Sequence, residues 1–219
     1  MINWFLYSAL LCVLISYISS LRAFRLDVPE IFRQFSYFLL FVFLSETFGM
    51  AWPRWIYQHT PFAQTNQWFY VFFHFIMYLF YLYFFYKVLQ RPKPRKVVKL
   101  LAVIYILFAS INLLFIEGVM KLNIYSDLLA SFIMVFLSIV YYYQLLKARE
   151  VISLKNDIAF WISTGIFIFH LGSLMGNFLI NYVYKTSPTV ALMIHHIIQV
   201  SSMVMYLTYS IAYLCHRKK

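Results

Sequence analysis

One glutamate and four histidines lie within apolar stretches of this 219-residue sequence. Glu46 sits inside the apolar run from Phe38 to Met50, where a carboxylate must be paired, protonated or bound to a cation. The histidines are His74, His170, His195 and His196. Imidazole nitrogens and carboxylate oxygens are common ligands of zinc and iron. The candidates for a metal site are Glu46, His74, His195 and His196.

The spacing of these residues matches no diagnostic metal-binding motif. The sequence contains no HExxH or CxxC pattern, and no GxSxG pattern that would mark a serine nucleophile. A single histidine in a spanning helix is more often a hydrogen-bonded core residue than a metal ligand. We therefore expect no cofactor and no catalytic residue. A metal site is the less favoured alternative, and enzyme activity stays open.

Polar side chains recur at helical spacing in five apolar stretches. Two long series are Gln67, Tyr70, His74, Tyr78 and Tyr81, and His195, Gln199, Ser202, Tyr206, Tyr209 and Tyr213. Shorter series are Asp127, Ser131, Ser138 and Tyr142, then His170, Asn177 and Asn181, and finally Tyr105 and Asn112. Residues at such spacing share one face of a helix. These faces indicate either hydrogen bonds between helices or the lining of a cavity.

The composition indicates which elements carry these residues. Hydrophobic residues make up 63% of the chain and charged residues 11%. Soluble domains have roughly 45–50% and about 25%. A soluble chain of this size could not bury so much apolar surface, and disordered chains have low hydrophobicity. The composition therefore predicts an integral membrane protein.

Seven stretches are long and apolar enough to be spanning helices, which need about 20 residues. They run near 4–21, 31–51, 67–88, 98–116, 127–146, 158–182 and 190–214. All six prolines lie between these stretches or at their edges, and proline breaks helix interiors. The prediction is an all-α membrane protein in which residues 1–219 form a single seven-helix transmembrane bundle.

The positive charges predict the orientation. Of the 18 Lys and Arg residues, Arg54, Lys121 and Lys185 fall in one set of connections and all the others in the alternate set. Because Lys and Arg concentrate on the cytoplasmic side, the N-terminus should lie outside and the C-terminus in the cytoplasm, in the plasma (inner) membrane. The net charge of +11 then reflects topology and attraction to anionic lipid headgroups. We expect no nucleic-acid partner.

This topology places most of the buried polar residues in the outer half of the membrane, with His170 near the middle. Hydrogen bonds between helices would not concentrate on one side, whereas a cavity that faces outward would. The predicted ligand-binding residues are Glu46, His74, Asn112, His170, Asn177, Asn181, His195 and Gln199.

Glycines form a second face on the sixth stretch. Gly165, Gly172 and Gly176 align opposite His170 and Asn177, and the last two glycines form a GxxxG motif. Such a face allows two helices to pack closely. It predicts close packing within the chain or, as the alternative, contact with a protein partner or a second copy.

The sequence Phe160-Trp-Ile-Ser-Thr-Gly165, ahead of His170 and Gly172, together with the seven-span layout, resembles the heptahelical sensory regions of bacterial membrane receptors. Those regions accompany membrane histidine kinases. The resemblance implies a sensor. Because the sequence given stops at Lys219, it implies signalling to a separate partner. The residue types, but no ordered motif, also resemble the heptahelical zinc hydrolases related to ceramidases and adiponectin receptors.

The sequence thus predicts a multi-pass plasma-membrane protein with an outward-facing polar cavity. Its expected function is to bind a small or lipid-like ligand as a sensor or receptor-like module. The alternatives are a membrane-embedded His/Glu metal-dependent hydrolase, a transporter, or a structural subunit of a membrane complex.

Overall fold

A computed structural model describes residues 4–52, 65–121, 123–147 and 153–216 of the chain. The long helices are α1 (Trp4–Ser20), α2 (Glu30–Ala51), α3 (Gln67–Val88), α4 (Pro92–Ile111), α5 (Ile124–Leu146), α6 (Ile158–Thr186) and α7 (Pro188–Cys215). Short helical segments are η1 (Leu21–Phe24), η4 (Asn112–Ile116) and η5 (Leu154–Asn156). No strand occurs in these four ranges, which hold seven helices long and apolar enough to cross a membrane. The prediction of an all-helical chain with seven such helices is confirmed.

Two helices begin earlier than the stretches predicted for them. The fourth helix begins at Pro92 instead of near residue 98, because Pro92 and Pro94 fit in its first turn. The backbone N–H groups of a first turn have no acceptor within the helix, so proline costs little there. In the same way α7 begins at Pro188, and Ser187 alone separates it from α6.

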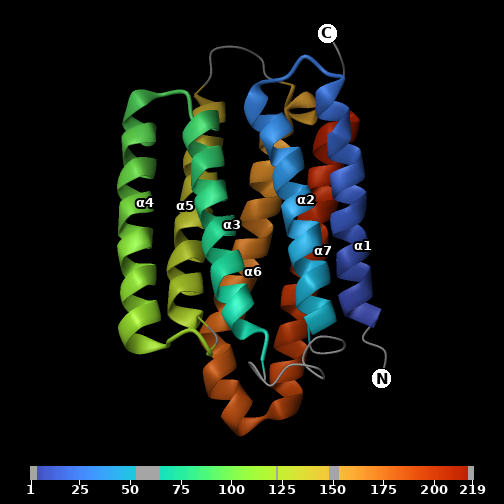
Figure 1. The fold of residues 1–219 in the computed structure, drawn as a ribbon. Helices are drawn as coiled ribbons and strands as arrows, with labels where there is room; N and C mark the ends of the chain where they lie inside the picture. The colour runs from blue at the N-terminus through green and yellow to red at the C-terminus, as the bar shows by residue number, and fades with distance from the viewer. Residues whose placement is uncertain (1–3, 53–64, 122, 148–152, 217–219) are drawn as a thin grey trace.

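Six of the helices form a ring, and α4 stands outside it (Figure 1). Around the ring the order is α1, α2, α3, α5, α6 and α7, and α7 then packs against α1. Helix α4 packs on α3 and α5 and leaves large apolar side chains such as Leu107 and Ile111 exposed. The ring therefore encloses an interior to which six helices contribute.

The two ends of the bundle differ in charge. Figure 1 shows that α1, α3, α5 and α7 all end at the same end of the bundle. We call this the basic end, because Arg22, Arg25, Lys93, Lys96 and Lys155 lie in or beside the connections that follow α1, α3 and α5. Because successive helices run in opposite directions, the connections that carry these positive charges lie at the same end of the bundle.

Aromatic side chains fill the interior nearer the basic end. Phe35 of α2 is fully buried and meets the ring of Tyr209 on α7 edge to face, with centroids 5.1 Å apart. The Tyr209 hydroxyl donates to that of Tyr81 on α3 at 3.2 Å. The Tyr213 hydroxyl donates to the backbone oxygen of Phe32 at 2.9 Å. In this half of the bundle α2 and α3 therefore meet α7 through side chains.

The glycine face of α6 is covered by α7 of the same chain. A Cβ atom at Gly172 would lie 2.8 Å from Ser201 Oγ, and one at Gly176 would lie 2.6 Å from Ile198 Cδ1. A Cβ at Gly165 would collide with the Thr208 hydroxyl. The structure therefore uses this face for close packing within the chain.

Candidate functional site

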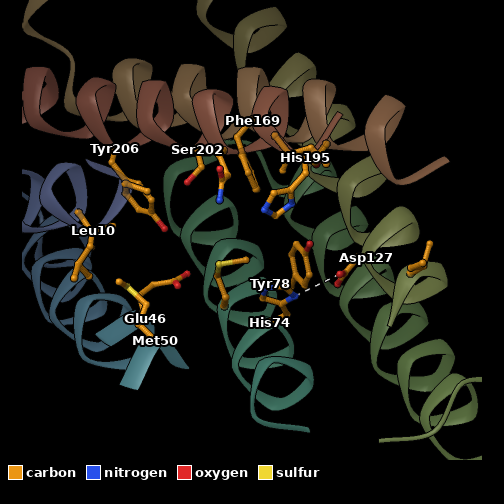
Figure 2. Close-up of a pocket in the computed structure, with 17 residues that line it drawn as sticks. Leu10, Glu46, Met50, His74, Tyr78, Asp127, Phe169, His195, Ser202 and Tyr206 are labelled. Carbon is orange, nitrogen blue, oxygen red and sulfur yellow. Dashed lines mark ion pairs between the residues drawn. The ribbon is translucent and has the colours of Figure 1, made fainter. Parts of the chain in front are cut away.

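In the half of the bundle opposite the basic end, six helices line a cavity of about 470 Å³. Its polar lining includes Glu46, His74, Asp127, His195, Gln199 and Ser202. Its apolar lining includes Leu10, Met50, Met77, Tyr78, Phe169 and Tyr206. Every helix except α4 contributes a described lining residue. Figure 2 shows Glu46 of α2 directed into the same space as His195 and Tyr206 of α7.

Glu46 is held near the end of α2 by a tyrosine from α3. The Tyr70 hydroxyl donates to Glu46 Oε2 at 3.2 Å. Tyr70 reaches this position by lying across Gly49, where a Cβ atom would be 2.7 Å from Tyr70 Cζ. Asn66 Nδ2 also donates to the Gly49 backbone oxygen at 2.8 Å. A glycine one turn after Glu46 therefore lets α3 supply a hydrogen-bond donor to this carboxylate.

His74 and Asp127 form an ion pair on the other side of the cavity, drawn as the dashed line in Figure 2. His74 Nδ1 of α3 lies 3.4 Å from Asp127 Oδ2 of α5, and the two side chains are 33% and 17% exposed. Asp127 lies in the first turn of α5, where the helix dipole favours a negative charge. The pair fixes the direction of both side chains at the cavity wall.

Two acceptor atoms in the wall have no donor. Asp127 Oδ1 and Gln199 Oε1 are buried, and none of the described residues donates a hydrogen bond to either atom. Leaving a buried acceptor without a partner costs about 1–3 kcal/mol. A bound molecule with donor groups would remove that cost.

Helix α7 supplies the longest polar face of the cavity. His195, Gln199, Ser202 and Tyr206 all line it, in the 4-3-4 order recognised in the sequence. The same face continues toward the basic end as Tyr209 and Tyr213, which lie in the aromatic packing. One helix face thus connects the cavity to the aromatic part of the interior.

The structure brings four of the predicted ligand-binding residues together: Glu46, His74, His195 and Gln199 all line the cavity. His170 lies behind the wall. It is fully buried, its Nδ1 lies 3.2 Å from the Ser131 hydroxyl, and its ring packs against Phe169 and Tyr78.

Asn112 lies outside the ring, in η4. Its side-chain amide donates to Glu117 Oε2 at 2.6 Å and to Ser126 Oγ at 2.9 Å, so it joins the end of α4 to the start of α5. The side chains of Asn177 and Asn181 lie outside the described part of the structure, so their predicted role stays a prediction.

Three of the four metal candidates, Glu46, His74 and His195, line the cavity, whereas His196 is not among the lining residues. Within the described residues, no three His, Cys, Asp or Glu side chains lie close enough to hold a metal ion.

Sequence reasoning missed Asp127 and Gly49 as parts of the site. Asp127 belonged to a recognised polar face, but the predicted helix began at this residue, whereas α5 begins at Ile124. Gly49 could have been found from its position three residues after Glu46, which places both residues on the same face of α2.

Comparison of the chain with protein-family models, with curated proteins and with solved structures gives no match. The function is therefore argued from the geometry of the cavity.

Proposed function

We propose that this chain is a sensor or receptor-like protein of the plasma membrane, which binds a small or lipid-like ligand in the cavity and signals to a separate protein. Its N-terminus would lie outside and its C-terminus in the cytoplasm. The observation that carries the proposal is the cavity itself, which is mostly apolar, has a few convergent polar groups and is lined by six helices. Small-molecule sites have this character.

The positive charges support the proposed orientation. The basic end would face the cytoplasm, because Lys and Arg concentrate on that side and are attracted to anionic lipid headgroups. The cavity lies in the other half and would then be reached from outside.

Aromatic packing closes the interior on the basic side of the cavity in the described conformation. A transporter must open its site to both sides of the membrane in turn. Here the interior between the cavity and the basic end is occupied by fully buried rings, among them Phe35, Tyr81, Phe84, Tyr209 and Tyr213. A ligand that changes the spacing of α3 and α7 at the cavity would move these rings, because the same helices carry both. That movement could reach a partner at the cytoplasmic side.

Native mass spectrometry of the purified protein tests the ligand-binding part of this proposal. The wild-type protein should carry a bound small molecule or lipid that resists delipidation. Ser202→Phe, which places a ring in the cavity, should lose that molecule. Leu207→Phe is the matched control, because Leu207 is exposed on the same helix. Equal occupancy in both variants would contradict the proposal.

A further inference from the structure

We infer that the cavity accepts an organic cation, namely an amine or ammonium group attached to an aromatic or short aliphatic body. The inference rests on the proposed ligand-binding function and specifies the ligand class.

The charged groups of the cavity favour a positive ligand. Its lining has two carboxylates, Glu46 and Asp127, and no lysine or arginine. His74 is already paired with Asp127, so its ring can offset one of these carboxylates but not both. Glu46 is contacted by the neutral Tyr70 hydroxyl and is the carboxylate that a cationic ligand would neutralise.

The hydrogen-bonding groups of the cavity also favour a positive ligand. Two buried polar atoms of the cavity wall have no hydrogen-bond partner among the described residues, Asp127 Oδ1 and Gln199 Oε1, and both are acceptors. They come from α5 and α7, whereas Glu46 comes from α2, so the acceptors surround the cavity from three helices. An ammonium group has several N–H donors and no acceptor, which is the complement of this arrangement.

The rest of the wall suits an organic body. Phe169, Tyr78 and Tyr206 line the cavity together with Leu10, Met50 and Met77. Aromatic faces attract cations as well as apolar groups, and this attraction strengthens where water is excluded. Ca²⁺ takes six to eight oxygen ligands and Mg²⁺ takes six, which is more than these side chains offer.

Binding to a matched series of small probes tests the inference. The probes are 2-phenylethylamine, 2-phenylethanol and 3-phenylpropanoate, which share a phenyl group and differ in charge. Binding is measured by ligand-observed NMR and by thermal shift on the full chain in nanodiscs at pH 8, where ordinary histidines are neutral. The amine should bind roughly tenfold more tightly than the alcohol, and the carboxylate should not bind measurably.

Variants then assign the binding to the cavity. Glu46→Gln and Asp127→Asn should each weaken amine binding roughly tenfold while leaving alcohol binding unchanged. Glu30→Gln is the matched control, because Glu30 is exposed at the basic end of α2 and should leave amine binding unchanged. Tyr70→Phe removes a neutral donor and keeps the Glu46 charge. It should preserve amine binding, so it separates loss of charge from loss of fold.

The outcomes distinguish the inference from the function on which it rests. If the alcohol or the carboxylate binds as tightly as the amine, or if the amine fails to bind, the ligand class is wrong. Ligand binding as such would still stand if Ser202→Phe displaces a molecule that the wild-type protein carries. If amine binding survives both Glu46→Gln and Asp127→Asn, the cavity is not the amine site.

Discussion

The Tyr70 ring lies directly over Gly49, in the space that a Cβ atom would fill. This contact allows the Tyr70 hydroxyl to reach Glu46, which lies one turn earlier on α2. Tyr70 therefore has two roles: it holds α2 against α3, and it orients the Glu46 carboxylate.

Gly49→Ala should displace Tyr70 and break its hydrogen bond to Glu46. Overpacking a close contact of this kind typically costs about 1–3 kcal/mol in the free energy of unfolding. Thermal unfolding of the purified protein measures the effect. Thr47→Ala is the control, because Thr47 is exposed on α2 and bonds only to its own helix. Its effect should stay within about 0.5 kcal/mol. A Gly49→Ala protein as stable as the control would show that Tyr70 can move without cost.

Glu46→Gln separates a functional carboxylate from a structural one. Glutamine keeps the shape and still accepts a hydrogen bond from Tyr70, but it removes the charge. Expression and thermal stability should stay nearly unchanged, whereas binding of a cationic ligand should weaken roughly tenfold.

Glu46→Leu is the comparison, because leucine cannot accept that hydrogen bond. It should lower stability by about 1–2 kcal/mol, the order of an interhelical hydrogen bond. Normal ligand binding by a well-folded Glu46→Gln protein would decide against a functional role for the carboxylate.

The pair of His74 and Asp127 should be energetically coupled. A double-mutant cycle with His74→Leu and Asp127→Ala isolates their interaction from the loss of either side chain alone. Because both groups are partly exposed to the cavity, we expect a modest coupling of about 1 kcal/mol in thermal or chemical unfolding. Strictly additive effects would mean that the 3.4 Å contact contributes no stability.

Cysteine labelling tests the orientation. Cys12 and Cys215 are first replaced by alanine, and single cysteines are then placed at Lys93 and Lys121, which are exposed at opposite ends of the bundle. An impermeant thiol reagent added to intact cells should label Lys121→Cys and spare Lys93→Cys until the membrane is opened. The predicted topology fails if both positions are labelled from outside, or if the pattern is reversed.

The number of helices, their approximate ends and their polar faces could be predicted from the sequence. Composition and proline positions specify spanning segments, and a period of 3.6 residues identifies which side chains share a face. This is why the stripe from His195 to Tyr206 lines the cavity as a unit.

The helix that each face would meet could not be predicted in the same way. Asn112 has the same signature as Gln199, a polar side chain in an apolar helix, yet α4 packs outside the ring and Asn112 bonds to the start of α5. Asp127 could be assigned to the site only once α5 was known to begin at Ile124. The role of Gly49 could be recognised only once the position of Tyr70 was known. These facts depend on contacts between segments, which no single helical period encodes.

Closure of the ring by α1 against α7 has a consequence for biogenesis. Leu10 and Val13 of the first helix share the cavity wall with Gln199 and Ser202 of the last. Before α7 has been synthesised, the cavity therefore lacks one of its walls. The cavity is complete only when α7 has packed against α1, so under the proposed function occupancy by a ligand would report that the last helix is in place.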